Sequence, residues 1–219
     1  MDAIVAPNLA PKAADKPTLP LHNVPLVEAT PSSLEGYGEL IDTQDAREIE
    51  IVRWPQPDWR PVDPGTGDEG GTTEGIFHFA WHGDVLRGRN EAVTDDYVLG
   101  WSCDPQSASE TDQSCGRSQV LLWHSNYHPD GGQLFFPLDP GPFVVPLALP
   151  GDDVKPSDFV AFWFDGGQGL YIHPSVWHEG VFPVNARQRF FDKQGKVHAR
   201  ISVDFGKEFG CYLSVPLSK

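Results

Sequence analysis

Residues 121–141 read LLWHSNYHPDGGQLFFPLDPG, and they decide how the rest of the chain is interpreted. An apolar run leads to His124 and His128, and a Pro-Asp-Gly-Gly turn then leads to Gln133 and a second apolar run. Residues two apart on a strand point to the same face, so His124, Asn126 and His128 are predicted to share one side of a strand. The stretch predicts a β-hairpin that gathers imidazoles and an amide near its turn.

Short apolar runs like these recur along the chain, separated by turn-forming residues. The 219 residues include 22 glycines and 21 prolines. Ten runs follow residue 74: GIFHFAWH, YVLGWS, SQVLLWHS, QLFFPL, FVVPLAL, DFVAFWF, GLYIHP, GVFPV, ARISVDF and CYLSVP. Many short strands with frequent turns are typical of an all-β barrel or sandwich, and a chain of this length commonly forms one such domain.

The two ends of this pattern suggest a simple division of the chain. Residues 1–30 are rich in proline and lack periodicity, so we predict an extended N-terminal arm, followed by a single barrel domain over 31–219. The stretch PSSLEGYGELID predicts one helical turn capped by Ser32 or Ser33. Residues 54–74 combine turn formers with acids and predict a surface loop.

The charge balance limits the partners. With 16 basic and 31 acidic residues, the net charge is −15, which disfavours nucleic acid and anionic membranes as partners. No apolar run approaches the roughly 20 residues needed to span a bilayer, and the N-terminus lacks the pattern of a signal peptide. We therefore expect a cytoplasmic protein.

The three cysteines suggest neither a disulfide framework nor a thiolate zinc site. Cys103, Cys115 and Cys211 are odd in number and have no CxxC spacing. Cys103 and Cys115 could bridge in an oxidising compartment, but thiols stay reduced in the cytoplasm, which favours the free form.

Histidine carries the chemical signal, because it titrates near neutrality and is the commonest metal ligand. A single histidine beside aromatic residues is usually structural, and this interpretation is favoured for His78, His82 and His198. His128 and His178 belong to two separate motifs, and for them a functional role is favoured.

The two motifs resemble those of the cupin superfamily. In the first cupin motif, HxH precedes an acid that lies five positions after the second histidine. Here Asn126 stands in place of the first histidine, His128 is the second and Gln133 replaces the acid. IHPSVWH, ending at His178, is similar to the second cupin motif.

The closer resemblance is to the ureidoglycolate lyase family, once called ureidoglycolate hydrolase. It is carried by YHPDGGQLFFP and GLYIHPSVWHEGVF, with further similarity in EGYGELID, KPSDFVAF and ISVDFG, and it runs from about 32 to 206. The chain departs from the family pattern at Asn126, at His124 and in WHEGVF, and it has an enlarged segment over 76–118.

The resemblance implies a double-stranded β-helix (a jelly-roll barrel) with one or two short helices, usually a homodimer. It also implies a lyase that cleaves ureidoglycolate to glyoxylate and urea in purine and allantoin breakdown. The reaction needs a base for the hydroxyl proton and an acid for the departing nitrogen. The residues expected in catalysis are His128, His178, Gln133 and His173. Those expected to contact substrate are Arg87, Arg89, Trp177, Tyr127 and Asn126.

Metal binding and substrate identity stay open at this stage. His124, His128 and His178 could hold a divalent metal, but no carboxylate occupies the expected position, so a metal-free histidine site is favoured. Arg87 and Arg89 could bind the substrate carboxylate or form a loop ion-pair network with Glu91. The alternatives are a cupin enzyme recruited to another isomerisation, cyclisation or elimination, and a non-catalytic cupin that binds a small ligand.

Overall fold

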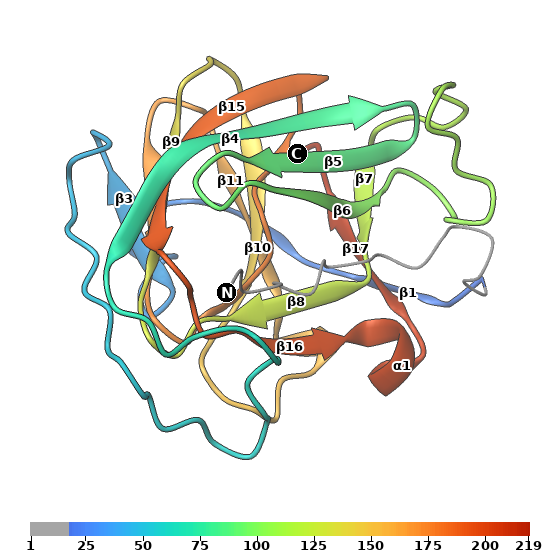
Figure 1. Cartoon of the computed structure of the whole chain (residues 1–219). Helices are drawn as coiled ribbons and strands as arrows, with labels where there is room; N and C mark the ends of the chain where they lie inside the picture. The colour runs from blue at the N-terminus through green and yellow to red at the C-terminus, as the bar shows by residue number, and fades with distance from the viewer. Residues whose placement is uncertain (1–17) are drawn as a thin grey trace.

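The computed structural model describes residues 18–219, and nearly all regular structure in them is β (Figure 1). One sheet has ten strands, in the spatial order β1 (Leu21–Asn23), β17 (Tyr212–Pro216), β7 (Gln119–Leu122), β6 (Asp95–Trp101), β5 (Val85–Asn90), β4 (Thr72–His82), β15 (Arg187–Gly195), β9 (Gln133–Pro137), β12 (Gly169–Ile172) and β3 (Gly38–Ile41). The predicted all-β class is confirmed.

The second sheet has the order β16 (Ile201–Asp204), β8 (His124–Tyr127), β13 (Trp177–His178), β10 (Phe143–Ala148), β11 (Val160–Phe164) and β2 (Leu26–Glu28), with β14 (Phe182–Pro183) paired to β10. Figure 1 shows β4, β5 and β6 on one side of the molecule and β8 and β16 on the other. Two packed sheets of this kind fit the expected cupin-type barrel.

Alternation along the strands fills the space between the sheets with aromatic rings. Phe190 of β15 packs edge-on against Phe79 of β4, with ring centroids 5.6 Å apart, and against Phe143 of β10 in the other sheet, at 4.9 Å. All three rings are buried. Burial of each such side chain contributes about 1.5–3 kcal/mol, so these contacts join the two sheets.

Helices are short in the described part of the chain. A 3₁₀ turn spans Pro156–Asp158, and α1 spans Phe205–Phe209. The Asp204 side chain accepts a hydrogen bond from the Lys207 N–H at the start of α1, and Gly210 ends the helix with φ +63°. The helical turn expected near residue 33 is a hydrogen-bonded turn rather than a helix, because the Ser33 hydroxyl bonds backward to the Glu28 carbonyl.

The N-terminal arm has structure where it is described. Residues 1–17 lie outside the described part of the chain. β1 pairs in parallel with β17 in one sheet, and β2 pairs in parallel with β11 in the other. Residues 18–30 therefore border both sheets. Among the described residues, no helix has the length and apolar character needed to cross a membrane.

The loop predicted over 54–74 is present, although its C-terminal end already belongs to β4. Arg60 ties it to the body: its side chain is buried, bonds the Asp152 carbonyl at 2.8 Å and forms an ion pair with Glu208 at 2.7 Å. A loop pinned in this way can form part of the rim of a site.

Candidate active site

The turn between β8 and β9 contains the predicted glycine pair, but the predicted β-hairpin is wrong, because β8 belongs to the seven-stranded path and β9 to the ten-stranded sheet. A Cβ on Gly132 would lie 2.5 Å from the Tyr171 hydroxyl, and one on Gly131 would lie 2.5 Å from Ile51 Cδ1. At Gly132 the Ile172 carbonyl oxygen would also lie only 2.6 Å away, so the close backbone approach requires glycine there, whereas at Gly131 the end of the Ile51 side chain can move aside. The turn brings His128 and Gln133 to one end of the barrel.

His128 is held as a neutral imidazole. Its Nδ1 donates to the Ala199 carbonyl at 2.9 Å, which leaves Nε2 as the free acceptor. Its ring stacks on His198 with centroids 4.1 Å apart and planes 8° from parallel. Burial, followed by the nearby imidazoles of His198 and His178, holds the pKa of His128 well below its ordinary value.

His198 is held by the segment between β8 and β9. Its Nδ1 donates to Asp130 at 2.8 Å, and its Nε2 accepts the Gly195 N–H at 2.9 Å. Because both ring nitrogens of His198 are occupied, its contribution to the site is the flat surface against which His128 stacks. The structural role favoured for His198 fits this geometry.

His178 reaches the same place from β13. Its Nδ1 donates to the Val176 carbonyl at 2.8 Å, and burial lowers its pKa to about 4. The ring is therefore neutral near pH 7 and keeps an unprotonated Nε2. This atom lies 3.2 Å from Gln133 Oε1, and the ring centroid lies 5.1 Å from that of His128.

A buried carboxylate orients Gln133. Its Nε2 donates to Asp192 Oδ1 at 2.7 Å, so its Oε1 faces His178. Asp192 also accepts hydrogen bonds from Asn90 at 2.8 Å and Gln194 at 2.7 Å. Burial raises the pKa of Asp192 to about 6, although these three hydrogen bonds oppose the rise.

These groups face a cavity of about 80 Å³. It is lined by Phe77, Asn90, Tyr97, Asn126, His128, Gln133, Phe135, His178, Glu179, Gly180, Gln194 and Arg200. Among residues 18–219, Arg200 is the only lysine or arginine that lines it. A groove of about 520 Å³ shares Tyr97, His128, Gln194 and Arg200 with the cavity and gives it a route to solvent.

Arg200 offers its charge to this cavity. Its Nε donates to Asp63 Oδ2 at 2.7 Å, which fixes the guanidinium plane. Within the described part of the chain, no hydrogen bond uses its two terminal nitrogens. A guanidinium with both terminal nitrogens available can bind a carboxylate through two parallel hydrogen bonds.

The remaining predicted residues fall into two groups, and the first lies close to the cavity without joining it. His124 Nδ1 donates to the Glu179 carboxylate at 2.9 Å. It does not line the cavity, because residues four apart on a strand are separated by roughly 13 Å. Tyr127 and Trp177 point to the opposite face of their strands, where their rings pack 4.7 Å apart and donate to Asp152 and Gly151.

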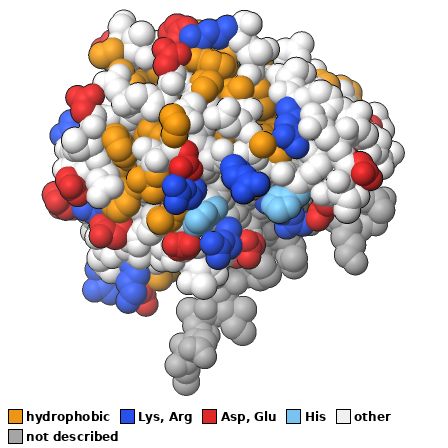
Figure 2. All heavy atoms as spheres, turned by 90° about the horizontal axis from the view of Figure 1, so that it is seen from above, with side chains coloured by type: hydrophobic (Ala, Val, Ile, Leu, Met, Phe, Trp, Pro, Cys, Tyr) orange, Lys and Arg blue, Asp and Glu red, His pale blue; other side chains and the backbone are white. Residues whose placement is uncertain are grey.

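The second group lies outside the barrel. His173 is half-buried, 3.4 Å from Glu39. Arg87 pairs with Glu110 at 2.7 Å and Arg89 with Glu91 at 3.2 Å, on the outer face of β5. Figure 2 views the molecule from above and shows lysine, arginine and histidine side chains gathered on this exposed face. The structure thus brings together His128, His178, Gln133 and Asn126, and it keeps the two arginines away from them.

The site residues that were not predicted from the sequence include Asp192, Gln194 and Arg200. β15 reads RQRFFDKQG, and its even-numbered residues are buried. Its alternation placed Gln188, Phe190, Asp192 and Gln194 on one face, which was the available signal. Frequent charges masked this strand in a search for apolar runs.

The fit to a divalent metal is poor. The neutral atoms that could hold one are Nε2 of His128, Nε2 of His178 and Oε1 of Gln133. The Glu179 carboxylate also lines the cavity, but it is already bound by His124 Nδ1 at 2.9 Å. The Asp192 carboxylate behind Gln133 is already bound by three amides. Two imidazoles and one weakly binding amide oxygen fall short of the three strong protein ligands of a typical catalytic metal site.

The part of the chain that forms most of this site is similar to known proteins. Residues 102–201 match the family model described as ureidoglycolate lyase. This segment, a little under half of the chain, is similar to ureidoglycolate lyases. It contains every polar residue that lines the cavity except Asn90 and Tyr97, which β5 and β6 of the enlarged 76–118 segment supply. The ureidoglycolate lyase match is shorter than the resemblance seen in the sequence, which runs from about 32 to 206.

Individual relatives carry the same name. Ureidoglycolate lyase of Stutzerimonas stutzeri is 40% identical over 70 residues, which make up 31% of this chain and 41% of that protein. The Pseudomonas aeruginosa PAO1 protein of that name has the same identity and coverage, and the Pseudomonas fluorescens Pf0-1 protein is 42% identical over 72 residues, 32% of this chain and 42% of its own. The chain thus matches about two fifths of the length of these ureidoglycolate lyases.

Proposed function

We propose that this chain is a carbon–nitrogen lyase that cleaves ureidoglycolate, or a closely related ureido acid, to glyoxylate and urea. The observation that carries the proposal is the meeting of two neutral imidazoles and one free guanidinium in a single cavity, within the segment similar to ureidoglycolate lyases. A small acid with one carboxylate and several N–H and O–H groups matches these partners.

The reaction moves one proton. The substrate carbon carries a hydroxyl, a carboxylate and the ureido nitrogen. Removal of the hydroxyl proton lets the oxygen form a carbonyl while the carbon–nitrogen bond breaks, and the departing nitrogen takes up a proton to give urea. One base that first accepts and then returns a proton is therefore sufficient.

His178 suits this base. Its Nε2 carries a lone pair at neutral pH because burial lowers its pKa to about 4. Once protonated, Nε2–H can donate to Gln133 Oε1, 3.2 Å away, which Asp192 holds in that direction. The protonated ring is thereby stabilised at the stage where the reaction forms it, and its low basicity favours return of the proton to the departing nitrogen.

The other residues bind and orient substrate. Arg200 would take the carboxylate through its two free terminal nitrogens. His128 Nε2 would accept a hydrogen bond from the ureido N–H, and the amides of Asn126 and Gln194 would bond the urea oxygen and the remaining N–H groups. Phe77 and Phe135 would exclude water from the reacting carbon.

The predicted role in purine and allantoin breakdown follows from this reaction. A homodimer in the cytoplasm also remains a proposal taken from the resemblance. Light scattering of the purified protein tests the dimer, which predicts twice the mass of the 24.2 kDa chain.

The test is release of urea and glyoxylate from racemic ureidoglycolate, with and without a chelator. We expect turnover by the wild-type protein, its loss in His178→Ala and a raised KM in Arg200→Gln, with no effect of the chelator. Arg187→Ala, on the outer face of β15, is the matched control for Arg200. A chelator-sensitive rate would restore the metal hypothesis.

Two results would replace the proposal. Absence of turnover with intact binding of small acids, lost in Arg200→Gln, would make the chain a non-catalytic binding protein, which Gln133 at the expected acid position favours. Absence of both would indicate a cupin enzyme recruited to a different isomerisation, cyclisation or elimination.

A further inference from the structure

The segment between β6 and β7, residues 102–118, is anchored on a single carboxylate in the turn between β4 and β5. Asp84 is completely buried. It accepts hydrogen bonds from the backbone N–H groups of Ser109, Ser114 and Cys115, and from the hydroxyls of Ser102 and Ser114. Burial raises the pKa of Asp84, but the hydrogen bonds outweigh it and the net pKa is lowered. The Asp84 carboxylate therefore holds the loop through these hydrogen bonds, and we call this arrangement the Asp84 clamp.

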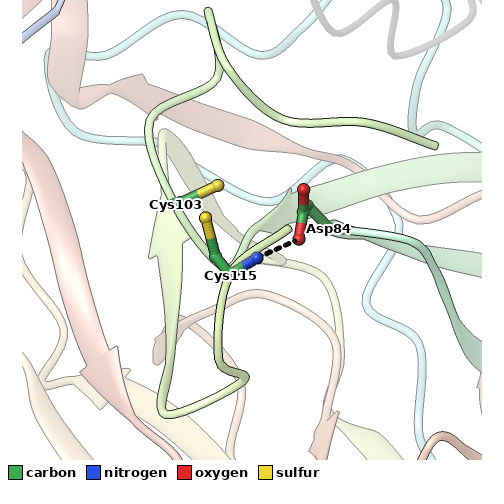
Figure 3. A group of neighbouring side chains, drawn as sticks. All are labelled: Asp84, Cys103 and Cys115. Atoms are coloured by element: carbon green, nitrogen blue, oxygen red, sulfur yellow. Dashed lines mark hydrogen bonds between the residues drawn. The ribbon is translucent and has the colours of Figure 1, made fainter. Parts of the chain in front are cut away.

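The clamp brings the two ends of the loop together. Cys103 follows β6, and Cys115 lies near the end of the loop, one residue after Ser114. The two sulfur atoms and an Asp84 oxygen all lie within 4.8 Å of one another, and Figure 3 shows the thiols side by side. Both cysteines are partly accessible to solvent. A disulfide bond is about 2.05 Å long, so small side-chain rotations would close the gap.

Gly83 makes the approach of the loop possible. Its φ is +55°, and a Cβ there would lie 2.2 Å from the Ser109 carbonyl oxygen. The Asp84 N–H donates to that same oxygen at 2.7 Å. The loop is therefore already folded against the β4–β5 turn in the form that carries free thiols, and closing a bond between its ends needs little reorganisation.

A metal site is less consistent with the same residues. Structural zinc sites use four ligands, most often cysteine and histidine. In the described part of the chain, the group contains only these two thiols and Asp84. The Asp84 oxygens are occupied by the hydrogen bonds that shape the loop. Two thiols remain, which is the requirement of a disulfide.

We propose that Cys103 and Cys115 form a reversible disulfide by exchange with a low-molecular-weight disulfide such as oxidised glutathione. One cysteine thiolate attacks the glutathione disulfide, which forms a mixed disulfide and releases one glutathione thiolate. The second cysteine thiolate then attacks the protein sulfur and releases the second glutathione. The two protein thiols lose two protons and two electrons in total, and two molecules of glutathione carry them away.

Cys115 is the attacking residue in this scheme. Burial raises the pKa of the Cys103 thiol to about 11, so Cys103 is protonated near pH 7 and acts second. The bond would fasten the β6–β7 loop at the rim of the barrel. Because neither cysteine lines the cavity, its effect falls on stability rather than on the site.

The test is equilibration of the full chain with mixtures of oxidised and reduced glutathione, followed by acid quenching, denaturation and maleimide labelling. Intact mass and peptide mapping then count free thiols. We expect all three cysteines to be labelled under reducing conditions, and only Cys211 after oxidation. The thermal midpoint of the oxidised protein should rise by several degrees, as for other short disulfide-closed loops.

Variants separate this result from general thiol oxidation. Cys103→Ser should keep a mixed disulfide with glutathione at Cys115, whereas Cys115→Ser should leave Cys103 reduced. Neither variant should show a rise in the midpoint, and Cys211→Ser should behave as wild type. Ser114→Ala removes one hydroxyl from Asp84, so it should need a higher proportion of oxidised glutathione for half closure.

Three outcomes would overturn the proposal. The first is labelling of both cysteines at every glutathione ratio. The second is persistence of mixed disulfides in the wild-type protein. The third is stoichiometric retention of zinc by the reduced protein that is lost in Cys103→Ser, which would reassign the thiols as metal ligands.

Discussion

Consecutive residues of β5 and β15 point to opposite faces of the sheet, and the inner and outer faces differ in burial and in charge. Asn90 and Asp192 point inward, are buried and bond each other at 2.8 Å. On the outer face, the neighbouring arginines Arg89 and Arg189 are more than half exposed and pair with Glu91 and Asp139. The exposed face holds most of the local charge, while on the buried face burial raises the pKa of Asp192 to about 6.

The difference shows where a charge can influence chemistry. Exposed ion pairs are screened by water and each contributes at most about 1 kcal/mol. The inner groups lie in a medium that strengthens hydrogen bonds and penalises charge, which is why burial moves the pKa values of His178 and Asp192 in opposite directions. Paired variants, one on each face, test whether only the inner face affects turnover.

The largest contrast is expected between two histidines. His178→Gln should lower kcat/KM for ureidoglycolate by about 10²–10⁴-fold, because it removes the proposed base. His78→Gln, on the outer face beside Glu91, should leave the rate within about twofold of wild type. Steady-state kinetics on both variants measures the contrast. Similar losses in both would remove the basis for assigning the base to the cavity.

The next contrast involves the residue that orients Gln133. Asp192→Asn cannot accept hydrogen bonds from all three amides, so Gln133 should lose its direction toward His178. Loss of a hydrogen bond to a charged group costs about 1.5–3 kcal/mol, which corresponds to a fall in kcat of about 10- to 100-fold. KM should change little.

Asp139→Asn is the matched control for Asp192, since Asp139 holds Arg189 on the outer face. Circular dichroism establishes that both variants are folded. An unchanged kcat in a folded Asp192→Asn protein would show that Gln133 needs no orientation.

The free energy of unfolding should fall at acid pH because His178 is buried as a neutral ring. Its pKa falls from 6.5 in the unfolded chain to about 4 in the folded protein, so below pH 6.5 the unfolded chain binds more protons. The stability associated with the neutral His178 ring is fully present above pH 6.5 and is lost as pH falls toward 4. Relative to His178→Gln, the wild-type protein should lose about 3 kcal/mol of unfolding free energy between pH 7 and pH 4.

Denaturant titrations at several pH values measure this difference. Asp192 acts in the opposite sense, since its raised pKa stabilises the fold at low pH and this contribution is lost as pH rises through about 6. It is present in both proteins, so its contribution cancels in the comparison. A difference independent of pH would mean that His178 is not held neutral by burial.

The smallest effect is expected on the outer face. Arg89→Ala should change the unfolding free energy by less than about 1 kcal/mol and leave turnover unchanged, because its side chain is 58% exposed and its partner Glu91 also pairs with His78. Thermal unfolding and the urea assay measure both quantities. A large rise in KM would instead support the role in substrate binding predicted from the sequence.

The sequence predicted the parts of the site that lie close together along the chain. His128 and Gln133 flank one tight turn, and His178 belongs to a second recognisable motif. Asp192 and Arg200 could not be placed, because only the pairing of β15 with β9, and of β16 with β8, brings them to the cavity. Arg87 and Arg89 attracted notice as a basic pair, but a residue type does not reveal which face of a strand it occupies.

The pairing of β1 with β17 has a consequence for how the chain acquires its fold. Leu21–Asn23 binds alongside Tyr212–Pro216, so two strands that lie far apart in the sequence pair with each other. Such distant pairings are slow to form, and the edge of β17 stays open until they do. On the ribosome, this sheet cannot be completed before residue 216 has left the exit tunnel. A nascent chain that stalls earlier presents unpaired strands to its neighbours and to chaperones.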